Sequence, residues 1–409
     1  MATFLLVIIY LAFISLGLPD SLLGVAWPVM QTDFNAPLET AGYLYMAIAG
    51  CTIISSIVSG RLLKRFGTGN VTFVSCLMTA CALLGFHFSP SVIWLFLCTI
   101  PLGLGAGAVD AGLNDYVATH YKAHHMSWLH SFWGVGATLG PVLMAQFISG
   151  QHSWKNGYLT IAGIQFLLVI ILLLTLPLWG KVTKSRSAAL SEEPVDTTDF
   201  SKQHEENEKI KPLQIKGVKL ALLSFLFYCA VEATMGLWGS SFLVEVKELP
   251  AGVAAQWVSL YYGGITVGRF ITGFITFKMN NLTLIRTGQL LALAGAALLF
   301  LPLPSIFSLI GFIMVGLGLA PIFPCMLHET PARFGKKHSQ TIMGYQMALA
   351  YTGSTFMPPL IGFIAAQSTI GIFPVCIVGF VVVMFLCSEK LNHSLKKTLV
   401  ITKSTNSTI

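Results

Sequence analysis

Five ionisable side chains lie inside long apolar stretches of this chain, at Asp20, Asp110, Asp115, Glu232 and Arg269. An ionisable group surrounded by apolar helices is costly unless it is paired with another charge or lines a wet cavity. These residues are therefore the first candidates for binding a proton or a polar ligand.

Asp20 lies in the first apolar segment, past its middle. It is expected about 16 residues into a helix, or ~24 Å along the axis at 1.5 Å per residue. Burial there would favour the neutral carboxyl group, which could take up a proton from one side of a membrane and release it to the other. We predict a role in proton coupling or ligand binding. A fixed hydrogen bond or ion pair with a neighbouring helix is the alternative.

Asp110 and Asn114 are four residues apart and therefore share one helix face. An acid beside an amide on a cavity wall suits the hydroxyl groups of a sugar. Packing of polar side chains between helices is the alternative. Asp115 points away from this face and lies close to the cytoplasm. An ion pair with Arg65, with a gating or structural role, is the favoured interpretation of Asp115.

Glu232 and Arg269 are the strongly charged residues deep in the second half of the sequence. Mutual neutralisation would lower the free-energy cost of placing both charges in an apolar environment. A static ion pair and a coupling switch are both open. If Arg269 instead reaches Asp20 or a substrate, it would form part of a gate.

Four further side chains are candidates for contacting a solute. His130 could relay protons or hydrogen-bond a ligand, Gln346 could donate from its amide, and Trp133 and Trp238 could stack on the apolar face of a sugar. Structural hydrogen bonding and helix packing are the alternatives for each.

The elements that position these residues are predicted to be membrane helices. The chain is 55% hydrophobic and 10% charged, against roughly 25% charged in an ordinary soluble domain. Apolar stretches of about 20 residues recur, which is the length that crosses a bilayer. The predicted spans are residues 3–30, 38–62, 69–88, 92–118, 126–150, 157–180, 217–245, 251–277, 282–300, 304–328, 338–367 and 370–388.

The distribution of basic residues predicts the orientation. If the N-terminus is cytoplasmic, the external loops receive only Lys155 and Lys247, and the other loop lysines and arginines lie inside. This is what the positive-inside rule requires. We therefore expect a cell-membrane protein with both termini cytoplasmic, in which Arg61 and Arg65 are candidates for gating at the cytoplasmic surface.

A polar segment divides the twelve spans into two sets of six. Residues 181–216 mix charge, Ser, Thr and Pro, and are expected to form a flexible cytoplasmic linker. The predicted division is therefore a six-helix bundle over 1–180, the linker over 181–216, a second bundle over 217–388 and a cytoplasmic tail over 389–409.

The two sets of six are related by an internal repeat at an offset of about 212 residues. Asp20-Ser-Leu-Leu-Gly24 aligns with Glu232-Ala-Thr-Met-Gly236, and Leu102-Gly-Leu-Gly105 aligns with Val315-Gly-Leu-Gly318. Gly60-Arg-Leu-Leu-Lys-Arg65 aligns in turn with Gly273-Phe-Ile-Thr-Phe-Lys278. Parallel six-span halves are a recurring transporter design. The fold class is therefore predicted as an all-α membrane protein with two pseudo-symmetric halves.

Several motifs resemble those of the major facilitator superfamily. Gly60-Arg-Leu-Leu-Lys-Arg-Phe-Gly67 is similar to its loop motif between spans 2 and 3, with Lys64 at the usual acidic position, and Gly134-Val-Gly-Ala-Thr-Leu-Gly-Pro141 is similar to its span 5 stretch. Gly-Leu-Pro-Asp20, the Asp110-Ala-Gly-Leu-Asn114 run and His130-Ser-Phe-Trp-Gly resemble the fucose/glucose-galactose symporter group and the sodium-glucose transporter-like proteins. That resemblance implies proton coupling and sugar binding at Asp20 and Asp110.

The expected function is secondary active transport, with a proton-coupled symporter of a sugar or similar hydroxylated solute favoured over sodium coupling. A proton-coupled exporter of drugs or metabolites is the alternative, and a non-transporting sensor is disfavoured because the buried acids are retained. Catalytic, nucleotide and metal motifs are absent from the sequence. We therefore expect no enzyme activity, cofactor, metal or nucleic-acid partner, and a monomer in the lipid bilayer that binds a small molecule.

Overall fold

The computed structural model describes residues 2–121, 123–150, 153–191, 212–275 and 278–406, and these residues form helices joined by short loops. The first half holds α1 (Ala2–Asp20), α2 (Leu22–Phe34), α3 (Thr40–Phe66), α4 (Thr68–His87), α5 (Val92–His120), α6 (Ala123–Ser149) and α7 (Trp154–Ser191). The second half holds α8 (Val218–Glu245), α9 (Ala251–Ile275), α10 (Asn281–Phe300), α11 (Ser305–Leu319), α12 (Ile322–His328), α13 (Thr330–Phe334), α14 (Lys336–Gln367) and α15 (Phe373–Asn406), with short 3-10 turns at Pro212–Gln214 and Ile370–Ile372.

Two of the predicted spans are each broken into two helices. The first span consists of α1 and α2, which Pro19 separates near Asp20 because its ring removes a backbone donor and clashes with the preceding turn. The tenth consists of α11 and α12, with Pro321 at the break. Eleven spans in the described residues are long and apolar enough to cross a membrane. With α9, of 25 residues, they form the predicted twelve.

Two predicted boundaries differ from the structure. Helix α7 continues to Ser191, so the first residues of the predicted 181–216 linker are helical, and residues 192–211 lie outside the described part. Helix α15 continues to Asn406, well into the predicted 389–409 tail. Extending an existing helix avoids the cost of nucleation, so a polar segment that follows an apolar helix readily continues it.

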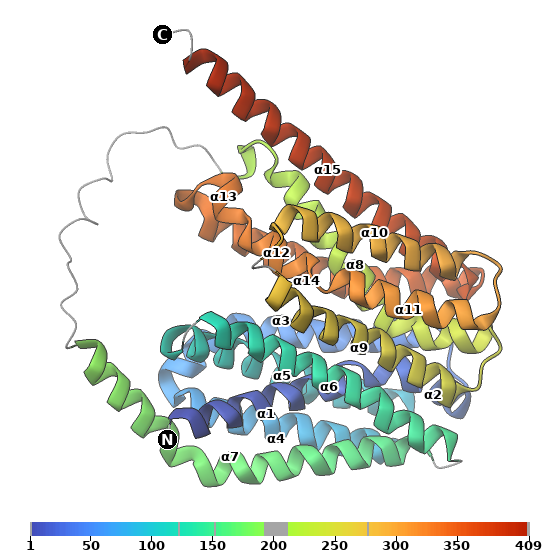
Figure 1. Cartoon of the computed structure of the whole chain (residues 1–409). Coiled ribbons are helices and arrows are strands. Elements are labelled where there is room, and N and C mark those ends of the chain that lie inside the picture. The colour runs from blue at the N-terminus through green and yellow to red at the C-terminus, as the bar shows by residue number, and fades with distance from the viewer. Residues whose placement is uncertain (1, 122, 151–152, 192–211, 276–277, 407–409) are drawn as a thin grey trace.

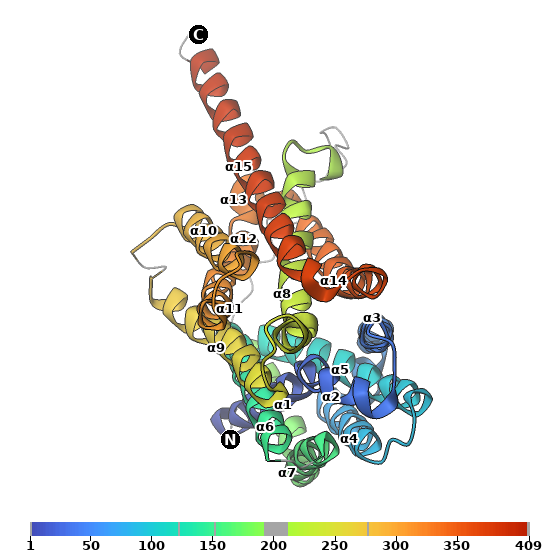
Figure 2. The ribbon, with the colours of Figure 1, turned by 90° about the vertical axis from the view of Figure 1, so that its right-hand side faces the viewer.

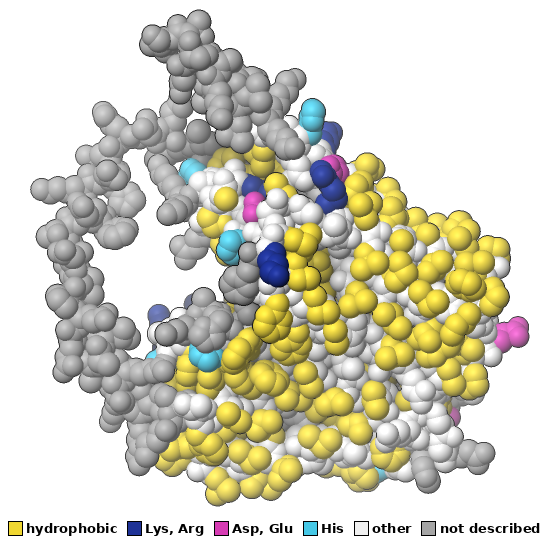
Figure 3. Space-filling model, viewed as in Figure 1, with side chains coloured by type: hydrophobic (Ala, Val, Ile, Leu, Met, Phe, Trp, Pro, Cys, Tyr) yellow, Lys and Arg dark blue, Asp and Glu magenta, His cyan; other side chains and the backbone are white. Residues whose placement is uncertain are grey.

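The two halves are separate bundles that lie side by side. Viewed along the helices, α1 to α7 form one group and α8 to α15 the other (Figure 2). The halves meet where α6 packs on α9, α2 on α8, and α3 on α14. Exposed apolar side chains cover the outer faces of the helices (Figure 3), as a chain surrounded by lipid requires.

Equivalent glycines make equivalent contacts in the two halves, which supports the sequence repeat. A Cβ on Gly103 of α5 would meet the backbone of α3, and a Cβ on Gly316 of α11 would meet the backbone of α9. Gly105 likewise packs against α4, and Gly318 packs against α10. These positions admit only glycine because neighbouring helix backbones approach closely there.

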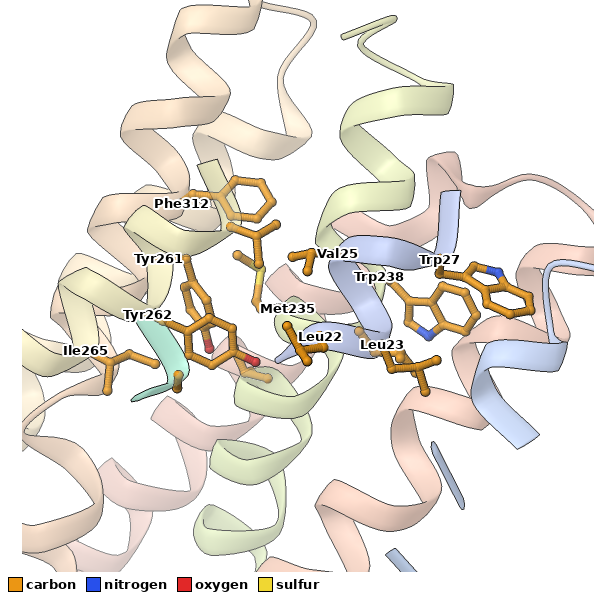
Figure 4. Packing of buried hydrophobic residues seen from close by; sticks show 14 of the residues in the cluster. Leu22, Leu23, Val25, Trp27, Met235, Trp238, Tyr261, Tyr262, Ile265 and Phe312 are labelled. Atoms are coloured by element: carbon orange, nitrogen blue, oxygen red, sulfur yellow. The ribbon is translucent and has the colours of Figure 1, made fainter. Parts of the chain in front are cut away.

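The ends of the molecule differ. At one end, here called the closed end, Gly42 of α3 packs against Pro359 of α14 and Gly252 of α9 packs against Ser149 of α6. The buried cluster between the halves includes Leu22, Val25, Met235 and Tyr262 (Figure 4). At the opposite end, called the linker end, α7 finishes and α8 begins (Figure 1). Here the molecule is hollowed between the halves (Figure 3).

Candidate functional site

Asp20 lies at the break between α1 and α2, near the middle of the span Thr3–Phe34. Its side chain is exposed although most neighbouring residues of the same span are buried. Its Oδ2 atom accepts a hydrogen bond of 2.7 Å from the Nε1–H of Trp133 on α6. The broken helix therefore presents a carboxyl group that solvent reaches and one partner holds in place.

Asp110 and Asn114 share one face of α5, as their spacing predicts. The Nδ2 of Asn114 donates to Oδ1 of Asp110 at 2.9 Å. Asp110 is half-buried and lies close enough to Asp20 for the two carboxyl groups to interact electrostatically. The structure thus brings the two first-half acids near each other, and both can bind protons or the hydroxyl groups of a solute.

Glu232 of α8 and Arg269 of α9 form an ion pair. The Nη2 atom of Arg269 lies 3.3 Å from Oε1 of Glu232 and 3.4 Å from the hydroxyl oxygen of Tyr228. The side chains are 15% exposed for Arg269 and 19% for Glu232. The predicted pairing is therefore present in the structure, and pairing lowers the cost of a charge at this depth.

Trp133 connects the two halves of the site. The Cζ atom of Arg269 lies 5.6 Å from the centre of the Trp133 ring, within the range of a cation–π interaction. The same indole donates its N–H to Asp20. An uninterrupted series of contacts therefore runs from Asp20 through Trp133 and Arg269 to Glu232.

His130 lies one turn before Trp133 on α6, and its ring packs edge-on against Phe13 with centroids 5.8 Å apart. It lies near enough to Arg269 to interact with it electrostatically. The imidazole is exposed, which leaves it available to a proton or a solute in the same space.

Two of the predicted binding residues lie away from this space. Gln346 is 1% exposed and accepts a hydrogen bond of 2.9 Å from Thr330. Trp238 is fully buried, donates to the backbone oxygen of Pro358 and fills the contact between Gly42 and Gly362. Sequence spacing did not show that both side chains turn into helix–helix contacts.

The predicted gating contact of Asp115 with Arg65 is not formed. Both residues are exposed, and the ion pairs of the described residues do not include them. Arg65 instead lies with its Cζ atom 5.3 Å from the ring centre of Phe66. Arg61 is exposed near the same end of α3. All three residues belong to the first half, on α3 and α5, at the linker end where the two halves are apart.

Sequence analysis missed several tyrosines around the site. Tyr228 lies four residues before Glu232, on the same helix face, and this spacing was the signal that could have identified it. Tyr45 and Tyr262 lie within electrostatic range of both Asp20 and Glu232, and Tyr351 lies within range of Asp110. No local pattern marks tyrosines on four separate helices as neighbours.

The fold and the central polar site define a membrane transporter. The Major Facilitator Superfamily profile matches residues 9–358. The chain belongs to this superfamily, and its predicted function as a transporter, not an enzyme, follows from the family. The narrower likeness to the fucose/glucose-galactose and sodium-glucose transporter-like groups stays a prediction.

Individual relatives are distant. The chain is 23% identical over 391 residues to the cis,cis-muconate transport protein of Acinetobacter baylyi, covering 92% of this chain and 90% of the relative. It is 22% identical over 364 residues to the glucose/mannose transporter GlcP of Bacillus subtilis, covering 88% of each. The crystal structure of a D-xylose-proton symporter superposes with a TM-score of 0.68 at 13% identity, over 93% of this chain and 96% of that one. The structural likeness concerns the fold.

Proposed function

We propose that this chain is a secondary active transporter that carries a sugar or a similar small hydroxylated solute together with a proton, by alternating access. The observation that carries the proposal is the pair of neighbouring first-half acids, Asp20 and Asp110. Asp20 is exposed at a helix break and bound to Trp133, and Asp110 is bound to Asn114 on α5. Acids that solvent reaches from one side can exchange protons with that side.

The charge of the site favours a neutral solute over an anion. The candidate site includes three carboxyl groups, those of Asp20, Asp110 and Glu232, and the guanidinium of Arg269, which Glu232 already neutralises. An anion such as muconate would meet the remaining acids as like charges. Hydroxyl groups would instead find acceptors on Asp20, on Asp110 and on the amide oxygen of Asn114, and donors on the nearby tyrosines. Relatives named for glucose, mannose and xylose agree with this preference.

Alternating access requires that the site open first to one side of the membrane and then to the other. If the N-terminus is cytoplasmic, as the distribution of basic residues predicts, the linker end lies at the cytoplasmic face of the cell membrane. The structure then corresponds to an inward-open state. The site would be reached from outside when the closed-end contacts separate and the linker end closes, with Arg61, Arg65 and Asp115 placed to form contacts there.

An exporter of drugs or metabolites is the second candidate. A pocket of about 230 Å³ lies between α3 and α14 and is lined by Thr52, Ile53, Ser56, Ile57 and Tyr351. This lining is largely apolar, which would suit a more hydrophobic substrate.

Proteoliposomes containing purified protein would test both candidates. Counterflow of labelled hexoses, of a hydrophobic cation and of muconate identifies the solute class, and an imposed pH gradient then tests accumulation. We expect hexose counterflow, and accumulation that Asp20→Asn and Asp110→Asn each abolish while counterflow continues. Asp33→Asn is the matched control, because Asp33 accepts the indole N–H of Trp154 away from this site. Accumulation retained in both site variants would refute the proposal, and counterflow of the cation alone would favour the exporter.

A further inference from the structure

Trp133 contacts a charged group of each half, and these two contacts differ in strength. Its bond to Asp20 is short, at 2.7 Å, as charge-assisted hydrogen bonds are. Arg269 makes longer contacts, at 3.3 Å to Glu232 and 3.4 Å to Tyr228, at or beyond the usual range for N–H···O bonds. The indole face under the guanidinium is therefore a substantial part of what holds Arg269 where it is.

The backbone of Trp133 cannot move relative to α1 without separating the two helices. A Cβ on Gly17 of α1 would collide with the backbone oxygen of Trp133, and a Cβ on Gly136 of α6 would collide with that of Ile14. On the other side of α6, Gly134 packs against Thr266 of α9. The Trp133 side chain is partly exposed, by contrast. Any response to Asp20 is thus confined to rotation of the indole.

We propose that Trp133 is a positioning residue that transmits protonation of Asp20 to Arg269, and so links the proton site of one half to the ion pair of the other. A charged Asp20 holds the indole N–H and keeps the ring under the guanidinium. A neutral Asp20 accepts a bond about half as strong, and the ring is then free to turn away. Arg269 is left with Glu232 and Tyr228, both on α8.

Rotation of the Trp133 ring would change the contact between the two halves. Arg269 lies on α9, which packs on α6 across the interface. When the ring turns away, the cation–π attraction between Trp133 of α6 and Arg269 of α9 is lost, while the contacts of Arg269 within its own half remain. Proton binding in the first half would therefore weaken one contact across the interface without breaking the Glu232 pair. This inference deepens the proposed function, since it assumes a proton-coupled transporter.

Other titratable groups surround this series of contacts and belong in the interpretation of any pH dependence. Asp110 on α5 and His130 on α6 lie in the same space, and α8 and α9 contribute acids, thiols and phenols. The facing groups are Tyr45, Asp110, His130, Tyr228, Cys229, Glu232, Tyr261, Tyr262 and Tyr351. The decisive experiment must therefore isolate Asp20 by substitution.

Fluorine NMR of purified protein labelled with fluorotryptophan tests the link without any substrate. The Trp133 resonance is identified by its absence in Trp133→Phe, and the Trp154 resonance by its absence in Trp154→Phe. As the pH is lowered and Asp20 takes up a proton, the Trp133 resonance should shift in the unaltered protein, and this shift should be absent in Asp20→Asn. Arg269→Gln should displace it at every pH. Trp154, bonded to Asp33 at 2.6 Å, is the internal reference for an indole–carboxylate bond outside the site.

A transport measurement completes the test. Trp133→Phe keeps an aromatic face for Arg269 but lacks the N–H, so pH-driven hexose accumulation should fall about tenfold. A Trp133 resonance that does not titrate, or that titrates equally in Asp20→Asn, would overturn the inference. So would unchanged accumulation in Trp133→Phe. Because the spectrum needs no hexose, failure of the proposed substrate class would leave the spectroscopic result decisive.

Discussion

Gly24 of α2 and Gly236 of α8, which occupy equivalent positions in the two halves, pack directly against each other at the closed end. The place of a Cβ on Gly24 is already taken by the backbone of Gly236 and Leu237. Around this contact, the side-chain hydroxyls of Ser21, Thr234 and Ser241 are buried without a hydrogen-bond partner among the described residues. The contact is therefore maintained by close packing, and water could satisfy these hydroxyls once it opens.

Gly24→Ala is expected to shift the protein towards the state in which the closed end is open, because the added methyl cannot fit while α2 and α8 touch. The measurement is the rate at which an impermeant thiol reagent modifies a cysteine introduced at the buried Ser241, in a background without native cysteines. We expect an increase of about tenfold, equivalent to ~1.4 kcal/mol.

Gly50→Ala is the matched control, since a Cβ on Gly50 would meet no atom within 4 Å. It should leave the modification rate within about twofold of the unaltered protein, as surface substitutions usually do. Equal rates in Gly24→Ala and Gly50→Ala would show that the glycine contact does not govern opening.

Removing Arg269 alone should be costly, because Glu232 would remain as an unpaired acid in a largely buried position. Arg269→Gln is expected to reduce the free energy of unfolding by about 1–3 kcal/mol, and adding Glu232→Gln should recover part of that loss. Thermal unfolding in detergent measures both variants.

The Arg286–Glu389 pair is the comparison for this prediction. Its atoms lie closer, at 2.6 Å, yet its side chains are 52% and 32% exposed. Because solvent screens such a pair, Arg286→Gln should cost less than ~1 kcal/mol. A larger loss in Arg286→Gln than in Arg269→Gln would contradict the importance of burial here.

Asn114→Leu should weaken hexose binding while leaving the helix intact. The substitution removes the amide that bonds Asp110 and the amide oxygen that can accept from the solute, so we expect the half-saturating hexose concentration to rise about tenfold. Counterflow at graded hexose concentrations measures this change. An unaltered concentration dependence would place the solute elsewhere.

Gln346→Met should affect stability and not transport. Gln346 is buried and bonded to Thr330, so its loss leaves a buried hydroxyl with one partner fewer, at a cost of about 1–2 kcal/mol. Hexose affinity should stay within about twofold. A marked loss of hexose affinity at unchanged stability would instead show that Gln346 contacts the solute.

The sequence by itself determined the class of the protein and much of its plan. Apolar stretches of membrane length must become helices, because lipid offers no partner for backbone polar groups. The repeat follows from glycines whose spacing is visible along the chain, and Gly24 and Gly236 show that the matched positions are also spatial neighbours. The acids Asp20, Asp110 and Glu232 stood out because each is costly in an apolar segment.

Only the tertiary structure decided which side chains share the central space. Trp133 and Trp238 are equally plausible from sequence, yet one lies between Asp20 and Arg269 and the other fills a helix contact. Helix rotation and tilt set this difference, and they depend on packing against neighbouring helices far away in the chain. For the same reason the partnership of Trp133 with one charge from each half has no signature in the sequence.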